Sequence, residues 1–139
     1  RNIFEMTMLK TPIFCYVIGE GASGGALGIG VGNKVYMLEN TWYTVIAPES
    51  CSSILWRNWN HKEDAANALK LTPKDALNEK FIDGIIEEPL GGAHYEPEVA
   101  YENLKQSILQ NIKAFSKFTG KELEAQRQEK FIAMGKFKG

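Results

Sequence analysis

The chain has 139 residues, of which 44% are hydrophobic, and this is enough apolar material for one domain-sized core. Its formal net charge is only −1, and no basic cluster or long apolar stretch is present, so the composition favours neither a nucleic-acid partner nor a membrane. Its two cysteines, Cys15 and Cys51, form no CxxC pair, which argues against a disulfide framework and a zinc site. We therefore expect a soluble, cytoplasmic protein with two buried thiols and no metal.

The first third of the chain predicts one helix and three strands. Apolar residues from Ile3 to Leu9 have helical spacing but no N-terminal cap, so the chain is expected to begin inside a helix, as a fragment would. Residues 13–18 form a continuous apolar run that is typical of a strand buried on both faces. Residues 34–38 and 43–47 read as two further short strands.

The remainder predicts mainly helices. Residues 51–56 suggest a short helix, and beyond Asn58 the pattern becomes amphipathic, with Ala65 and Leu69 on one face. Thr72 and Pro73 resemble a capped helix start. The expected later elements are a helix over 73–80, a strand within 81–86, a loop over 87–94, a long helix over 97–118 and a charged helix over 121–134. Strands that alternate with helices predict an α/β fold.

A glycine-rich segment follows the first predicted strand. Residues 19–32 contain seven glycines in fourteen positions. Because glycine costs about 1 kcal/mol relative to alanine inside a helix, so many glycines are not expected there for stability. Close approach of the backbone to another group is the expected reason for them.

Two side-chain interpretations of this segment are possible. Residues 19–24 match the GxGxxG pattern of dinucleotide-binding proteins, with Glu39 as a candidate ribose ligand, but the following helix has room to be only short. Residues 21–25 match the GxSxG pattern of serine hydrolases, with Ser23 as nucleophile and His94 as base. Asp64, Asp75 or Asp83 would complete the order of such a triad, although His94 can equally be a surface or capping residue.

A third interpretation assigns the function to the backbone. A strand, a glycine turn and a helix N-terminus would direct free N–H groups at developing negative charge, as an oxyanion hole does. Gly24 and Gly25 would then be glycine so that the oxyanion can approach. Close packing of the helix on the strand explains the same two glycines equally well, so the pattern alone leaves both explanations open.

Four sequence blocks resemble one known family. They are residues 17–27, 31–35, 46–56 and 82–94, and in this order they are similar to the alpha subunit of the bacterial and plastid acetyl-CoA carboxyltransferases. Ala22 and Ser50 stand where that family often has glycine, and residues 116–139 match less distinctly. The resemblance is more specific than any single motif because all four blocks occur in order.

The resemblance implies a crotonase-like α/β fold of stacked ββα units. Residues 1–118 would be the C-terminal part of the carboxyltransferase domain, and residues 119–139 a C-terminal helical tail. The family's N-terminal half, which carries a preceding strand and an active-site loop, has no counterpart in this sequence. The chain is therefore expected to be a fragment of such a subunit.

The resemblance also implies an activity. The family transfers the carboxyl group of carboxybiotin, held on a separate biotin carboxyl carrier protein, to acetyl-CoA, and the malonyl-CoA formed enters fatty-acid biosynthesis. The alpha subunit is active only with a beta subunit, in an α2β2 assembly, and carries no covalent biotin itself. It needs no metal of its own, since a zinc ribbon, where present, belongs to the beta subunit.

The implied site residues all lie in the glycine-rich segment. The backbone N–H groups of Gly24 and Gly25 would be the catalytic oxyanion hole for the ureido oxygen of biotin. The carboxybiotin-binding wall would comprise Gly21, Ala22, Ser23 and Ala26. Which of Gly24, Gly25 and Ala26 donates the key N–H stays open at this point.

Overall fold

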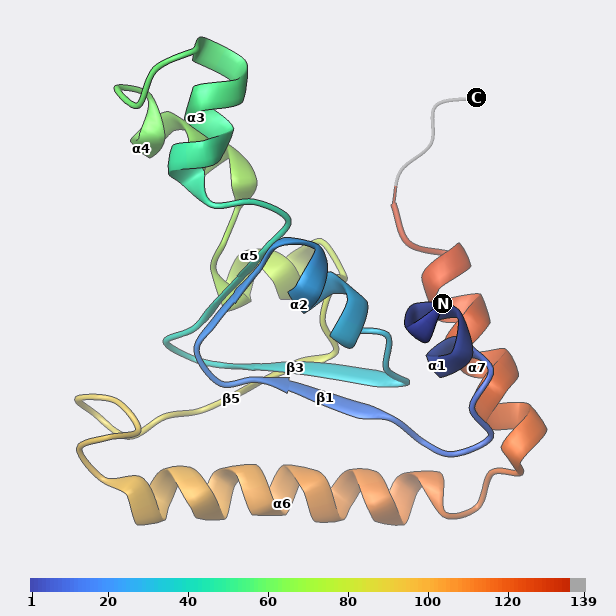
Figure 1. The fold of residues 1–139 in the computed structure, drawn as a ribbon. Helices are drawn as coiled ribbons and strands as arrows, with labels where there is room; N and C mark the ends of the chain where they lie inside the picture. The colour runs from blue at the N-terminus through green and yellow to red at the C-terminus, as the bar shows by residue number, and fades with distance from the viewer. Residues whose placement is uncertain (136–139) are drawn as a thin grey trace.

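The computed structural model describes residues 1–135, which form two small parallel sheets surrounded by helices (Figure 1). One sheet has the order β1-β3-β5, with strands β1 (Phe14–Val17), β3 (Lys34–Leu38) and β5 (Gly84–Ile86). The other pairs β2 (Glu20–Ala22) with β4 (Trp42–Thr44). All pairs are parallel, and parallel neighbours require crossover connections. The α/β class predicted from the sequence is thus confirmed.

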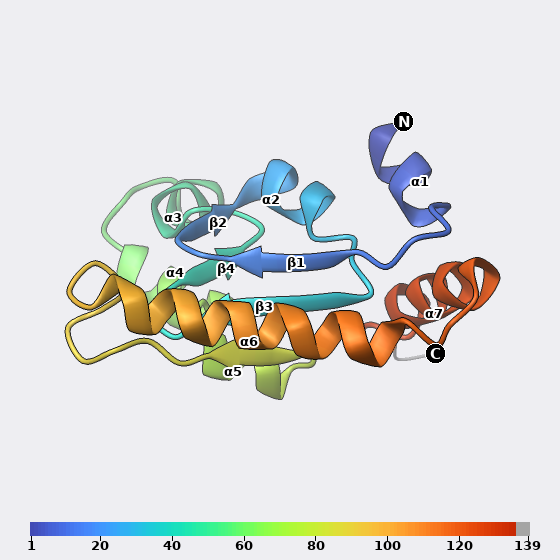
Figure 2. The ribbon, with the colours of Figure 1, turned by 90° about the horizontal axis from the view of Figure 1, so that it is seen from below.

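Seven helices complete the described part of the chain. They are α1 (Asn2–Thr7), α2 (Ser23–Ile29), α3 (Pro48–Trp56), α4 (Lys62–Leu69), α5 (Pro73–Asn78), α6 (Pro97–Phe115) and α7 (Gly120–Ile132). The long helix α6 runs along one face of the three-stranded sheet, and α2 and α5 lie on the other side (Figures 1 and 2). Helices α3 and α4 form a hairpin that projects away from both sheets (Figure 1). No helix of residues 1–135 is long and apolar enough to cross a bilayer.

The strands repeat in pairs. Strands β1 and β2 precede α2, and strands β3 and β4 precede α3, so that β1 pairs with β3 while β2 pairs with β4. The registers place Phe14 opposite Lys34 and Glu20 opposite Trp42. Two ββα units are therefore stacked, as the family resemblance predicts.

Each face of the three-stranded sheet is covered by a different kind of contact. On the α5 side, Val35, Met37, Ala76 and Ile82 form a fully buried apolar cluster. On the α6 side, the rings of Tyr16 and Tyr36 stack with centroids 5.2 Å apart. Asn111 of α6 accepts a hydrogen bond from Tyr36 (2.9 Å) and donates one to Tyr16 (3.0 Å).

Several boundaries differ from the sequence-based expectations. The strand expected over 43–47 begins at Trp42 and ends at Thr44, and the strand expected within 81–86 begins only at Gly84. The amides of Phe81 and Ile82 instead bond the Ala76 carbonyl at the end of α5. The long helix ends at Phe115 rather than residue 118. The two cysteines are half-buried rather than fully buried.

Two elements near loops differ from what the pattern suggested. Strand β2, inside the glycine-rich segment, was not expected at all, because three residues give no periodicity to detect. Thr119 does not merely follow the long helix but starts the next one, with a capping box formed by Thr119 and Glu122. The division of the chain at residue 118 into domain and tail stays a prediction.

Helix α7 is held to the body by a buried guanidinium. Arg127 is fully buried and donates to the carbonyl oxygens of Thr7, Leu9 and Thr11 and to Oδ1 of Asn33 (2.6 Å). Asn33 in turn donates to the Leu123 carbonyl of α7 (2.8 Å). One side chain therefore connects α7, the segment after α1 and the turn before β3.

Replacement of Arg127 by methionine tests this connection. Arg127→Met keeps an apolar stem but leaves several buried carbonyl oxygens without a donor, so we expect a loss of about 3 kcal/mol in the free energy of unfolding, measured in urea. The exposed Arg1→Met is the matched control, with an expected change of less than about 0.5 kcal/mol. Equal small effects of both substitutions would show that α7 is not held in this way.

A second contact of α7 is an ion-paired carboxylate. Asp83 accepts from Lys34 (3.1 Å), from Lys130 of α7 (2.5 Å) and from the Val35 amide (2.8 Å). Burial raises the pKa of the Asp83 carboxyl, but the hydrogen bonds from Lys130, Val35 and Lys34 outweigh it, and the pKa lies below the ordinary value of 3.8. The ionised carboxylate therefore contributes stability above that value, and this contribution is lost as the pH falls through the folded-state pKa.

The substitution Asp83→Asn isolates this contribution. At neutral pH we expect it to cost about 2 kcal/mol of unfolding free energy, because Lys34 and Lys130 lose their counter-charge. In acid, below the folded-state pKa, the wild-type carboxyl is also neutral and the difference between the two proteins should close. Urea unfolding at both pH values measures it, and a difference that persists in acid would contradict the ion-pair explanation.

Candidate functional site

The glycine-rich segment forms a sharp strand-to-helix turn. Strand β2 ends at Ala22, which is extended (φ −134°, ψ 158°), and α2 begins at the next residue. Ser23 has φ 68°, a left-handed conformation that costs a non-glycine residue about 1–2 kcal/mol. The first amides of a helix have no acceptor within it, and Ala22 offers no side-chain oxygen to cap them. The turn thus presents backbone N–H groups at an exposed helix start.

The glycines of this segment fall into two groups. A Cβ added at Gly32 would lie 2.7 Å from the Cys15 sulfur and 2.8 Å from the Lys34 carbonyl, and one at Gly21 would lie 3.1 Å from Tyr43. Gly28 and Gly30 are also crowded, by Ile3 and by Tyr43. Packing therefore requires glycine at Gly30 and Gly32 and favours it at Gly21 and Gly28.

Gly19, Gly24 and Gly25 form the second group. A Cβ added at any of these positions would meet no atom of the described chain within 4 Å, and all three residues are exposed. Of the three, Gly24 and Gly25 lie in the first turn of α2. The packing explanation that the sequence left open therefore finds no support in residues 1–135. The space beside both glycines is open to a group from outside this part of the chain.

The other predicted wall residues lie on different sides of the turn. Gly21 and Ala26 line a cavity of about 610 Å³ that runs along β1 and the underside of α2. Ser23 is exposed beside Gly24. Ala22 is half-buried and lies in the chain between Gly21, which lines the cavity, and the exposed Ser23. The structure thus brings Gly21 and Ala26 to one cavity, while Ser23, Gly24 and Gly25 face solvent.

The triad of a serine hydrolase is not assembled. Asp64 is hydrogen-bonded to His61, Asp75 to Thr72, and Asp83 to two lysines. His94 lies in a loop whose position depends on Glu88, which accepts from the Ala93 amide (3.1 Å) and from the Asn40 amide (2.6 Å). No interaction in residues 1–135 joins His94 to Ser23 or to any of the three aspartates, so the hydrolase alternative is not supported.

The dinucleotide interpretation is not supported either. Helix α2 has only seven residues, and Glu39 accepts a hydrogen bond from the Glu88 amide (3.3 Å) in the same loop contact. Glu39 and Glu88 are thus structural residues that link two loops. Glu88 lies within a block that resembles the family, but the sequence indicated no role for it, because its partners are backbone amides and one of them, that of Asn40, is 48 residues away.

Comparison with known proteins agrees with this geometry. A family model described as acetyl co-enzyme A carboxylase carboxyltransferase-like matches residues 1–135. The acetyl-coenzyme A carboxylase carboxyl transferase subunit alpha of Flavobacterium psychrophilum is 56% identical over 137 residues, which are 99% of this chain and 43% of that protein. The alpha subunit of Flavobacterium johnsoniae is 54% identical over 99% of this chain and 44% of that protein. The alpha subunit of Chlorobium phaeobacteroides strain BS1 is 55% identical over 97% of this chain and 40% of that protein. The chain spans less than half the length of these relatives.

The fold has solved counterparts. A transcarboxylase 12S structure with methylmalonyl-coenzyme A and methylmalonic acid bound superposes with a TM-score of 0.64 at 17% identity, covering 82% of this chain and 22% of that one. A second structure of the same enzyme, with hydrolysed methylmalonyl-coenzyme A, gives 0.62 at 16% identity. These neighbours have the crotonase fold, and they confirm the predicted architecture. Because the family model matches residues 1–135 and the relatives named above are more than 50% identical, the chain belongs to the acetyl-CoA carboxylase carboxyltransferase-like family.

Proposed function

We propose that this chain is the carboxybiotin-handling part of an acetyl-CoA carboxylase alpha subunit. With a beta subunit, it would transfer the carboxyl group of carboxybiotin, held on a separate carrier protein, to acetyl-CoA and so form malonyl-CoA for fatty-acid biosynthesis. The names of its relatives support this activity. Because the chain spans less than half of those proteins, the activity of the whole subunit is assigned here as a proposal.

The observation that carries the proposal is the open space at Gly24 and Gly25. Two consecutive glycines in the first turn of an exposed helix reduce its stability by about 1 kcal/mol each relative to alanine. Within residues 1–135 no neighbouring atom requires them, whereas Gly21, Gly28, Gly30 and Gly32 are all crowded. A ligand that must come close to the backbone accounts for them.

The residues present fit a ligand with a developing oxyanion. The amides of Gly24 and Gly25 would donate to the ureido oxygen of biotin as negative charge accumulates there, and neither residue has a Cβ to obstruct it. Carboxybiotin, when bound, would supply the carboxyl group and the base for the acetyl methyl proton. The chain would then need no side-chain acid or base, which agrees with the engaged aspartates described above. Gly21, Ala22, Ser23 and Ala26 would form the surrounding wall.

The conformation of Ser23 gives a second line of support. A left-handed serine at the first helical position turns the chain abruptly from β2 into α2. Local strain of this kind is common where a backbone is held in a functional geometry. At Ser23 the strained residue stands directly before Gly24 and Gly25.

Exposed apolar side chains support the proposed partners. In the α3–α4 hairpin, Ile54 and Trp59 are 70% and 66% exposed, and Leu55 is also exposed. Contiguous exposed apolar groups are typical of surfaces that contact other chains. We assign to the whole protein an α2β2 assembly in the cytoplasm, served by the biotin carboxyl carrier protein, with no nucleic-acid partner.

The first functional prediction concerns Gly25. We would place this chain in the Flavobacterium psychrophilum alpha subunit in exchange for the matching 43% of that protein, and assemble it with the beta subunit. Gly25→Val should lower the turnover number at least about tenfold, or roughly 1.4 kcal/mol in barrier, while the melting temperature stays nearly unchanged. Malonyl-CoA formation and thermal unfolding measure the two effects.

Gly32→Ala is the matched control for Gly25. Its Cβ would meet sulfur and backbone atoms below 3 Å, so it should reduce stability rather than turnover of the folded protein. Wild-type turnover in Gly25→Val would place the oxyanion hole elsewhere. Equal losses of turnover and stability in Gly25→Val would make Gly25 a packing residue in the full assembly.

The second functional prediction concerns Ser23, which the proposal uses only through the backbone. Ser23→Gly should stabilise the chain by about 1 kcal/mol, since glycine adopts φ 68° without strain. Ser23→Ala should retain most carboxyl transfer in the exchanged subunit, and a fluorophosphonate probe should leave Ser23 unlabelled. Stoichiometric labelling of Ser23 with loss of activity in Ser23→Ala would instead establish a nucleophilic serine.

A further inference from the structure

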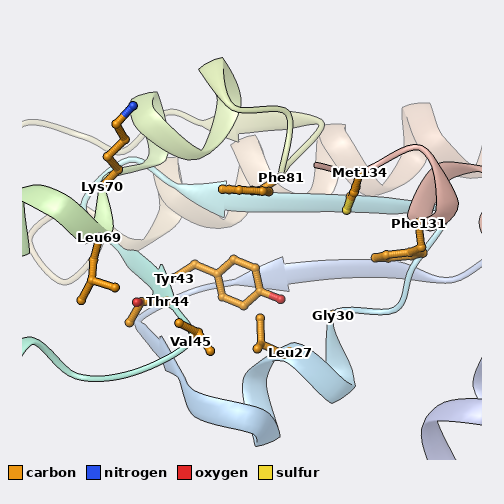
Figure 3. A pocket seen from close by; sticks show the side chains of 10 residues that line it. All are labelled: Leu27, Gly30, Tyr43, Thr44, Val45, Leu69, Lys70, Phe81, Phe131 and Met134. Carbon is orange, nitrogen blue, oxygen red and sulfur yellow. The ribbon is translucent and has the colours of Figure 1, made fainter. Parts of the chain in front are cut away.

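A second cavity adjoins the one along β1, because Gly30 and Tyr43 line both. It has a volume of about 390 Å³ and lies between α2, β4, the C-terminal end of α4 and the end of α7 (Figure 3). Its wall is formed mainly by apolar side chains, namely Leu27, Val45, Leu69, Phe81, Phe131 and Met134. Gly24 and Gly25 do not line it, so it is separate from the proposed oxyanion hole.

Tyr43 and Thr44 are the uncharged polar residues among those that line this cavity, and the Thr44 hydroxyl already donates to the Ile46 carbonyl (3.1 Å). The hydroxyl of Tyr43 lies at the α2 wall of the cavity, beside Gly30 (Figure 3), where it donates one long hydrogen bond, 3.5 Å, to the Ala26 carbonyl. Burial, and to a smaller extent the nearby Cys15, raises the pKa of the Tyr43 phenol, so it stays a neutral hydrogen-bond donor. A ligand with one acceptor atom can use this donor.

The cavity has little attraction for a charged ligand. Lys70 lines its edge, but the side chain points away from Tyr43 (Figure 3) and its ammonium pairs with Glu79 at 2.8 Å. No aspartate or glutamate of the described chain lines the wall. Burial of an uncompensated charge beside apolar side chains is strongly unfavourable.

The apolar wall is incompletely covered by the protein. Val45 remains 58% exposed and Phe81 48% exposed, although both border the same concave space. Protein interiors are normally close-packed, and an apolar cavity of about 150 Å³ already binds benzene. This cavity is therefore large enough for a molecule of roughly two fused aromatic rings.

We propose that this cavity binds an uncharged, largely apolar small molecule whose carbonyl group accepts the Tyr43 hydroxyl hydrogen bond. The site would also act on α2, because Leu27 lines it and the Tyr43 hydroxyl leaves no room for a Cβ at Gly30. A ligand that holds Tyr43 therefore holds the helix whose first turn contains Gly24 and Gly25. The site is a candidate effector site and does not depend on the proposed carboxyl transfer.

The direct test uses 6-propionyl-2-dimethylaminonaphthalene, an uncharged fluorescent two-ring ketone. The whole chain should bind it saturably at one site, with a blue shift of its emission. Tyr43→Phe keeps the ring but removes the donor, and should weaken binding about threefold to tenfold. Val45→Trp fills the cavity from its rim and should weaken binding more than about tenfold.

Matched controls make the outcome decisive. Leu90→Trp adds the same indole at a loop position that is 95% exposed and outside the cavity, and should leave the affinity unchanged. Decanamide should displace the probe, whereas decanoate and decyltrimethylammonium should not. Non-saturable binding, equal effects of Val45→Trp and Leu90→Trp, or displacement by the charged chains as effective as that by decanamide would overturn the proposal. An affinity unchanged in Tyr43→Phe would overturn the role of the hydroxyl.

Discussion

The parallel pairing of β2 with β4 is the contact on which the candidate site depends. Strand β2 is only three residues long, and it has no structure independent of its partner. Its pairing opposite residues 42–44 brings Gly21 against Tyr43 and leaves Ala22 extended at the end of the strand. The chain then has one residue, Ser23, in which to reverse into α2. The exposed amides at Gly24 and Gly25 follow from that turn.

A second set of contacts holds the turn indirectly. The glycine-rich segment ends at Gly32, and the next residue, Asn33, accepts from Arg127 and from the Ile13 amide. Asp83 then connects β3 to Lys130 of α7. Asn33 and Asp83 both lie in blocks that resemble the family, and in this structure both act as connectors. A block of family resemblance thus contains residues that position the site as well as residues that form it.

The two cavities around α2 give this short helix an unusual position. Ala26 and Gly21 face the cavity along β1, Leu27 faces the cavity beside Tyr43, and Gly24 and Gly25 face solvent. Seven residues with three glycines have little intrinsic helical stability, so most of the order of α2 comes from contacts with β2 and β4. A change in either cavity therefore has a direct route to the first turn of α2.

Much of the fold was accessible from the amino-acid sequence. The apolar runs at 13–18 and 34–38 predicted two strands of the main sheet, and the cap at Thr72 and the periodicity beyond Pro97 predicted helices α5 and α6. Local patterns of this kind are decided by side chains a few residues apart, which is why they are visible in the chain itself. The four blocks likewise identified the family and its crotonase-like fold.

Only the tertiary structure decided which glycines are required by packing. In the sequence, Gly21, Gly25 and Gly32 are equivalent, since a missing side chain has no pattern of its own. They differ in the atoms that folding brings to them. Tyr43 crowds Gly21 and Cys15 crowds Gly32, whereas no atom of the described chain lies close to a Cβ added at Gly25. The pairing of β2, the engagement of the three aspartates and the burial of Arg127 were hidden for the same reason, because each depends on partners brought together only by folding.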